Sequence, residues 1–203
     1  NTFDLKHKTG KSIGHFYQDV TEYLGFRNFE EGTVMGLSSF GEPKYYDLFL
    51  EIFNEKSDLI DIPTLFKKIK SRDYDKHLFK FYDKRIDKST PSWKEDVAAS
   101  LQKIAEEQII EWATLARQYG SKLCYAGGAA QNILANSKIK DLFDDVWIVS
   151  DPTDGGASLG AAAWAHANEF KVDRINWIDA YLGHNIERQI NVKEVVNYIL
   201  ENK

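Results

Sequence analysis

The chain has 203 residues, 43% of them hydrophobic and 28% charged, which is ordinary for a globular protein that buries a core. It holds no apolar run of about 18 residues that would span a membrane, and no basic-then-apolar segment that would direct export. The net charge of −5 argues against nucleic acid as a partner, because proteins that bind nucleic acid usually present a basic surface.

The single cysteine, Cys124, cannot form an internal disulfide and lies in an apolar run. We expect a small buried thiol rather than a nucleophile, because no histidine is near it in sequence. Cytoplasmic localisation fits these features best. The chain begins with Asn1 and its only methionine is Met35, so we expect it to be part of a longer protein.

In the first 90 residues a helical pattern follows Ser12, where apolar residues fall at three- and four-residue steps. A lysine- and arginine-rich run over 67–88 is interleaved with aspartates, and we interpret it as a solvated surface. The expected elements are a helix over 12–26 closed by Gly25, a short helix over 45–53, a strand over 58–62, and a helix with a variable insertion over about 63–90.

A long helix is predicted over 91–119. Ser92 and Glu95 have the spacing of a capping box, and Gly120 stands where a left-handed residue would end the helix. One face is expected to be apolar, formed by Val97, Leu101, Ile104, Ala105, Trp112, Leu115, Ala116 and Tyr119.

After Gly120 a strand, a glycine turn and a helix occur twice, which predicts an α/β fold with two adjacent parallel strands. The first set is a strand over 122–126, a turn at 127–128 and a helix beginning at 129–135. The second set is a strand over 146–150, a turn over 151–156 and a helix over 157–170.

The first turn contains Gly127, Gly128 and Asn132. Glycines let a ligand approach the main chain closely, and the following helix directs N–H groups and the positive end of its dipole toward the turn. We expect phosphate there, with Asn132 as an additional amide donor. A glycine pair that only packs a helix against a sheet explains the same pattern.

The second turn contains two carboxylates, Asp151 and Asp154, followed by Gly155 and Gly156. A carboxylate directly before a glycine pair is well placed to hold a metal ion that bridges to a phosphate. The alternative is that either aspartate caps the next helix. Ligands of open α/β sheets bind beyond the carboxyl ends of the strands, where both turns would lie.

The histidines do not suggest a metal site among themselves, because no two of them are three or four residues apart. His166 follows Trp164 on an expected helix. We interpret it as a packed or partly exposed residue rather than a metal ligand.

Several segments together resemble the O-carbamoyltransferases, the family of nodulation protein U and of the cephalosporin and tobramycin carbamoyltransferases. The resemblance runs in order over about 1–53 and 91–190, and 63–90 matches poorly. The segments that carry it are 12–17, 21–26, 34–43, 123–132, 143–148, 154–162 and 180–183.

The resemblance implies that residues 1–203 form the C-terminal part of an actin-like ATPase (ribonuclease H-like) domain, a mixed sheet flanked by helices, with a helical tail over about 191–203. Such a domain passes a carbamoyl group from carbamoyl-adenylate to an acceptor hydroxyl of a small molecule. A separate domain makes the adenylate from carbamoyl phosphate and ATP. The positions that match family sites are Asp154 as catalytic residue and ligand of a divalent metal, expected to be iron, and Gly127, Gly128, Asn132, Gly155 and Gly156 around the phosphates.

The sequence departs from the family pattern in its metal site. The family's His-x-x-x-His element is absent, and so is the adenylate-forming domain, so we expect this chain to be inactive alone. Thr33 stands where a lysine is expected. The open alternatives are a protein like the transferase that attaches threonylcarbamoyl to tRNA, and a noncatalytic nucleotide-binding module.

Overall fold

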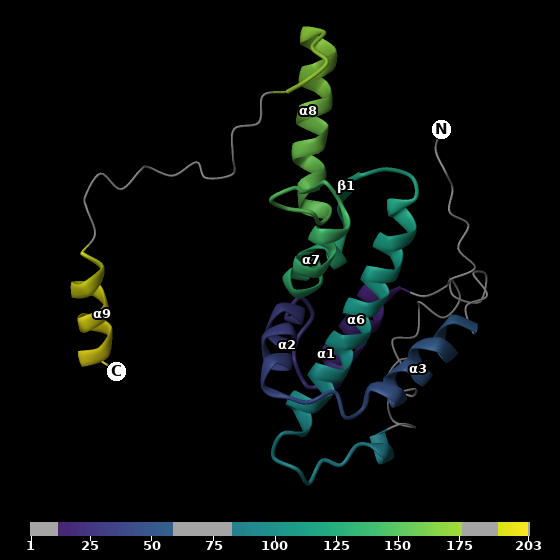
Figure 1. Ribbon diagram of the computed structural model, residues 1–203, viewed down its shortest axis with the longest axis vertical. Coiled ribbons are helices and arrows are strands. Elements are labelled where there is room, and N and C mark those ends of the chain that lie inside the picture. Colours follow the sequence, from purple (N-terminus) through teal and green to yellow (C-terminus); the bar gives the residue numbers. More distant parts are fainter. Residues whose placement is uncertain (1–11, 59–82, 176–190, 203) are drawn as a thin grey trace. The chain divides into compact units, whose positions relative to one another are not determined.

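A computed structural model of the chain describes residues 12–58, 83–175 and 191–202. The strand expected over 58–62 and most of the insertion expected over 63–90 lie outside these ranges. The helices are α1 (Ile13–Tyr23), α2 (Glu31–Leu37), α3 (Tyr46–Asp58), α6 (Trp93–Arg117), α7 (Ile133–Ile139), α8 (Ala157–Phe170) and α9 (Val192–Glu201), and the strands are β1 (Lys122–Tyr125) and β2 (Asp145–Ile148) (Figure 1). The chain divides into two units, 1–157 and 158–203.

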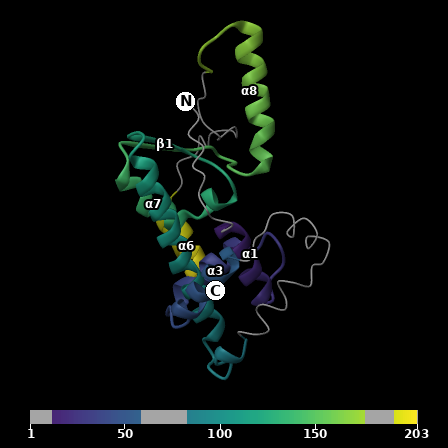
Figure 2. The ribbon, with the colours of Figure 1, turned by 90° about the vertical axis from the view of Figure 1, so that its right-hand side faces the viewer.

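The first unit is organised around α6, whose two halves pack on different partners (Figures 1 and 2). The N-terminal half shares a core with α1, α2 and α3. Residues of this core with at most 2% exposure are Phe16, Val20, Leu24, Val34, Phe49, Ile52, Val97, Ala98, Leu101, Ile104 and Ala105. The expected apolar face of α6 is therefore confirmed in its first half, but the expected contribution of Tyr119 is wrong, because that ring is 57% exposed.

Both expected end signals of α6 are wrong. Ser92 makes no capping hydrogen bond, and its hydroxyl instead donates to the carboxylate of Asp96 at 3.2 Å. A hydrogen bond to an ionised carboxylate is stronger than one between neutral groups, and this bond orients the Ser92 hydroxyl. The helix ends through Gln118 in the right-handed conformation, and Gly120 is not among the residues with positive φ. Gly25 does close α1 in the expected way, with φ +90°.

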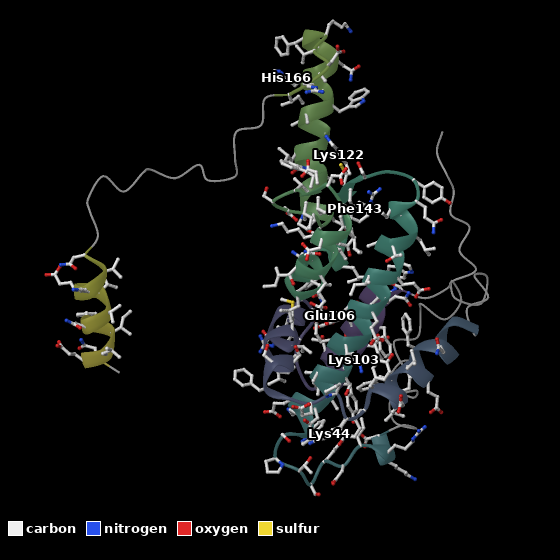
Figure 3. The ribbon with its side chains drawn as sticks, in the orientation of Figure 1. Lys44, Lys103, Glu106, Lys122, Phe143 and His166 are labelled. Carbon is white, nitrogen blue, oxygen red and sulfur yellow. The ribbon has the colours of Figure 1, made fainter. Side chains whose placement is uncertain are left out.

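The loop from Gly41 to Tyr45 is fixed to the start of α6 by the buried Asp96. Its carboxylate accepts hydrogen bonds from the Glu42 N–H at 2.9 Å and from the Lys44 ammonium at 2.7 Å. One turn later the Ser100 hydroxyl accepts from the Tyr45 N–H at 2.9 Å. A β-carbon on Gly41 would lie 2.1 Å from the carbonyl of Glu95, so only glycine fits there. Figure 3 shows Lys44 at this end of α6 and Lys122 beyond the other end.

The strands β1 and β2 pair in parallel, with Leu123 opposite Val146 and Tyr125 opposite Ile148. This confirms the expected pairing, although each strand ends a residue or two earlier than expected. Leu123, Tyr125 and Val146 pack on the core that the C-terminal half of α6 forms with α7. Within the described residues the sheet has these two strands only, so the mixed sheet of an actin-like lobe stays a prediction.

The expectation that Cys124 is buried is wrong. Successive side chains of a strand point to opposite faces of the sheet, and Leu123 and Tyr125 occupy the face toward α6 and α7. Cys124 therefore lies on the outer face and is exposed. Its partner in the ladder, Trp147, is 53% exposed on the same face.

The second unit contains α8 and α9. α8 spans the residues expected for a helix, and His166 on it is exposed, with its ring 4.7 Å from that of Phe170 between centroids. α9 falls in the expected helical tail, and the Asn191 side chain caps it by accepting from the Glu194 N–H at 3.4 Å. No helix in the described ranges has both the length and the apolar character needed to cross a membrane.

Candidate functional site

The two glycine turns meet at one edge of the sheet. β1 and β2 are parallel, so the turns that follow them leave from the same edge. The Gly127 N–H in the first turn donates to the carbonyl oxygen of Pro152 in the second, with N and O 2.7 Å apart. The structure thus joins the two segments that the sequence singled out separately.

The first turn presents open backbone on its outer side. Gly127 has φ +99°, a conformation that residues with a side chain rarely adopt. Apart from the adjoining residues, no atom of the described chain comes within 4 Å of the positions that β-carbons on Gly127 and Gly128 would occupy. Within the described residues, the N–H groups of Gly128 and Ala129 have no hydrogen-bond acceptor. Two adjacent unpaired N–H groups in a turn with open main chain are suited to an anion.

Asn132 ends the first turn and has a structural role. Its Oδ1 caps α7 by accepting from the Ala135 N–H at 3.0 Å. The same side chain exchanges two hydrogen bonds with Gln102 of α6. Gln102 Nε2 donates to Asn132 Oδ1 at 3.0 Å, and Asn132 Nδ2 donates to Gln102 Oε1 at 3.1 Å.

Gln102 is only 4% exposed and links three helices. Besides its bonds to Asn132, its Oε1 accepts from the Tyr17 hydroxyl of α1 at 2.9 Å, and its Nε2 donates to Glu106 at 2.9 Å. Glu106 in turn pairs with Lys138 of α7. Burial, followed by the negative charge of Glu106, raises the pKa of the Tyr17 hydroxyl well above its ordinary value. Tyr17 is therefore a neutral donor throughout the physiological range.

The second turn is organised by Asp151 and Thr153. Asp151 Oδ1 accepts from the Thr153 hydroxyl at 2.5 Å and from the Thr153 N–H at 3.1 Å. These two hydrogen bonds, the hydroxyl's first, lower the pKa of the Asp151 carboxyl. The Thr153 hydroxyl in turn accepts from the Gly155 N–H at 3.4 Å and caps the short helical turn Asp154–Gly156. Neither aspartate is the cap that the sequence offered as an alternative.

Gly155 and Gly156 are required by their closeness to Asp151. A β-carbon on Gly155 would lie 2.2 Å from Asp151 Oδ2, and one on Gly156 would lie 2.0 Å from the Asp151 carbonyl oxygen. The clash at Gly155 is with a side chain, which can change rotamer, whereas the clash at Gly156 is with the backbone, which cannot move without changing the turn. Steric fit within the turn therefore explains this glycine pair without any ligand.

Asp154 is exposed, and its carboxylate has no hydrogen-bond or ion-pair partner within the described residues. Asp151, by contrast, is occupied within its own turn. A metal site needs several donors, and the described part of the chain holds no cluster of three or more His, Cys, Asp or Glu side chains suited to one. Asp154 can therefore supply one oxygen ligand, and these residues do not make a complete metal site.

Sequence reasoning missed Gln102, Tyr17 and Thr153. Gln102 and Tyr17 lie 30 and 85 residues from the polar groups that they bind, so no local spacing marks them. Thr153 had a local signal, because an aspartate two residues before a threonine commonly accepts from it in a turn.

Residues 2–163 match the family model described as "Carbamoyltransferase N-terminus". Nodulation protein NolO of Bradyrhizobium diazoefficiens is 32% identical over 166 residues, which cover 74% of this chain and 28% of the relative. An uncharacterized protein of Synechocystis is 30% identical over 207 residues, covering 93% of this chain and 33% of the relative.

Nodulation protein U of Bradyrhizobium diazoefficiens is 36% identical over 91 residues, covering 41% of this chain and 16% of the relative. The chain thus spans about a third or less of the length of these relatives. The match to the family model extends over both glycine turns. The chain belongs to the O-carbamoyltransferase family and corresponds to the N-terminal region of its members.

Proposed function

We propose that this chain is part of an enzyme that passes a carbamoyl group from carbamoyl-adenylate to a hydroxyl group of a small molecule. The observation that carries the proposal is the contact between the two turns, in which Gly127 N–H donates to the Pro152 carbonyl at 2.7 Å. This contact brings an anion-binding turn and an exposed carboxylate to one edge of the sheet. Family membership supplies the reaction class.

The first turn is the proposed binding place of the adenylate phosphate. The N–H groups of Gly128 and Ala129 have no acceptor in the described chain, and the space beside the α-carbons of Gly127 and Gly128 keeps the main chain open to a ligand. Preorganised N–H donors stabilise negative charge without having to reorganise during the reaction. Asn132 would add one side-chain donor, while Gly155 and Gly156 give the second turn its shape. A nucleotide site of the actin-like ATPase class accounts for this arrangement.

Asp154 is the proposed metal ligand and catalytic residue of the second turn. When bound, a divalent metal such as iron would polarise the carbamoyl carbonyl. A carboxylate directly before the glycine pair, with no protein partner in the described chain, is suitable as one hard oxygen ligand. The remaining ligands would have to come from elsewhere in the full-length protein. Asp154 alone would bind metal weakly.

This chain by itself is proposed to be inactive. Carbamoyl phosphate and ATP would be converted to the adenylate in another part of the full-length protein. The relatives are about three times as long as this chain, which leaves room for such a part. Carbamoylation of any hydroxyl acceptor by the purified 203-residue chain would contradict this part of the proposal.

The test is the change Asp154→Ala in the full-length protein, with the two half-reactions assayed separately. We expect transfer to the acceptor to be abolished and formation of carbamoyl-adenylate from carbamoyl phosphate and ATP to be intact. The unfolding free energy should change by less than about 1 kcal/mol, because Thr153 rather than Asp154 caps the turn.

The matched control is Asp141→Ala. It removes the same charge from an exposed position before β2, at the opposite end of that strand from Asp154. The control should keep both half-reactions. If transfer survives at a near wild-type rate in Asp154→Ala, Asp154 is neither a metal ligand nor a catalytic residue.

A further inference from the structure

We propose that Gln102 is a positioning residue, which holds the Asn132 amide so that one N–H group points to the ligand side of the first turn. The inference rests on the proposed function, because it takes the first turn as the place of the adenylate phosphate. It adds a residue from α6 that lies outside both turns and 30 residues from Asn132.

The first step is that the hydrogen bonds of Gln102 leave its amide no other orientation. Both of its polar atoms are fully used: Oε1 accepts from Tyr17 and Asn132, and Nε2 donates to Glu106 and Asn132. The Glu106 carboxylate pairs with Lys138 and only accepts. The nitrogen of Gln102 must therefore face Glu106, and the oxygen must face Tyr17.

The second step is that this fixed amide sets the orientation of Asn132. The Asn132 oxygen faces two donors, Gln102 Nε2 and the Ala135 N–H, each at 3.0 Å. An inverted Asn132 amide would place its NH₂ group against both of them and its oxygen against Gln102 Oε1. Because buried polar groups of like kind repel and lose their partners, the inverted form is strongly disfavoured.

The third step is what remains available on Asn132. An asparagine NH₂ group has two hydrogens, and one of them is used by Gln102 Oε1. With the oxygen doubly occupied, the group left for a ligand is a donor. Asn132 is half-buried and directly follows the turn whose Gly128 and Ala129 N–H groups are also unpaired in the described chain, so its second amide hydrogen is the side-chain donor nearest in sequence to that turn. The network therefore selects an acceptor, and an anionic oxygen above all.

The test compares Gln102→Leu, Asn132→Ala and the double variant in the full-length protein, using transfer from isolated carbamoyl-adenylate to the acceptor. We expect each single change to lower kcat/KM by about 10- to 100-fold, the contribution of one hydrogen bond to a charged group. The double variant should be no worse than the worse single variant, because Gln102 acts through Asn132. Formation of carbamoyl-adenylate should be unchanged, and Gln108→Leu on the same helix is the control.

A second variant keeps the proposal testable if Gln102→Leu does not fold. Gln102→Glu keeps the shape and the oxygen that faces Tyr17 but loses the donor toward Asn132. Its carboxylate would face Tyr17 of α1, Glu106 of α6 and, through Glu106, Lys138 of α7. Two adjacent carboxylates raise the pKa of one of them, so protonation restores one donor, which Asn132 and Glu106 share. Transfer relative to wild type should therefore recover several-fold as the pH falls from about 8 to 6, measured where circular dichroism shows the variant fully folded at every pH.

The outcomes separate the two proposals. If Asn132→Ala leaves transfer unchanged, Asn132 does not bind the adenylate phosphate, and the positioning role of Gln102 fails while the proposed function stands. If the wild-type full-length protein transfers no carbamoyl group from carbamoyl-adenylate, the proposed function fails. If Asn132→Ala impairs transfer but Gln102→Leu does not, or if their effects multiply in the double variant, the positioning role of Gln102 alone is refuted. A Gln102→Glu variant whose activity relative to wild type does not change with pH also refutes it.

Discussion

Replacing Asp96 should remove the hydrogen bonds that hold the loop over 41–45 against α6. The Asp96 side chain is 2% exposed and accepts from the Glu42 N–H, the Lys44 ammonium and the Ser92 hydroxyl at 2.9, 2.7 and 3.2 Å. In Asp96→Ala all three donors lose their shared acceptor. The loop belongs to the segment 34–43 that resembles the family, so its attachment matters beyond local stability.

The expected loss is about 3 kcal/mol of unfolding free energy. Removing one partner of a buried, hydrogen-bonded charge typically costs roughly 3–5 kcal/mol. The lower end applies here because the Lys44 side chain is 54% exposed and can return to water. Most of the loss then comes from the Glu42 N–H and the Ser92 hydroxyl. Asp96→Asn should cost less, about 2 kcal/mol, because it keeps one acceptor oxygen.

The contribution of Asp96 should also depend on pH. Burial alone would raise the pKa of its carboxyl, but hydrogen bonds from the Glu42 N–H, Lys44 and Ser92 together hold that pKa below the ordinary value. A carboxyl whose pKa is lowered by folding stabilises the protein above its unfolded pKa of about 3.9, and this is lost as the pH falls through the folded value. The difference between wild type and Asp96→Asn should be constant above about pH 5 and shrink below about pH 4.

The assay is urea unfolding of the 203-residue chain followed by circular dichroism, together with hydrogen exchange of the Glu42 and Tyr45 amides. Exchange of both amides should accelerate in Asp96→Ala and stay at the wild-type rate in the control Asp141→Ala, which changes an exposed aspartate. Asp96 does not hold the loop if the unfolding free energy of Asp96→Ala lies within about 0.5 kcal/mol of the wild-type value. The same conclusion follows if the Glu42 amide of the variant exchanges no faster than in wild type.

Two further predictions concern glycines. Gly41→Ala should lower the unfolding free energy by about 2 kcal/mol or more, because its β-carbon would lie 2.1 Å from the Glu95 carbonyl. Gly32→Ala on α2 should raise the unfolding free energy by up to about 1 kcal/mol, because no described atom outside the adjoining chain lies within 4 Å of its β-carbon. Equal melting temperatures of Gly41→Ala and Gly32→Ala would contradict both expectations. Gly156→Ala should lower the melting temperature more than Gly155→Ala, because its clash is with the Asp151 backbone at 2.0 Å rather than with a side chain. The reverse order would mean that Asp151 does not shape the second turn.

Local patterns predicted much of the fold and the position of the candidate site. The spacing of apolar residues located α1 and α6, and the doubled strand, turn and helix located β1, β2 and α8 together with the parallel pairing. These signals work because the period of a helix or a strand is a property of neighbouring residues. The wrong expectations concerned how ends and faces are satisfied. Ser92 binds Asp96 rather than the helix end, and Cys124 lies on the outer face of the sheet.

The sequence by itself determined that two glycine turns follow two parallel strands and that one of them carries Asp154. Only the tertiary structure decided that Gly127 contacts Pro152, that Asp151 rather than Asp154 is used within the turn, and that Asn132 is held by Gln102. The reason is physical. Helices and strands follow from contacts a few residues apart, whereas a buried polar group must find whichever partner the packed helices bring to it, and Tyr17 and Gln102 are 85 residues apart in the chain.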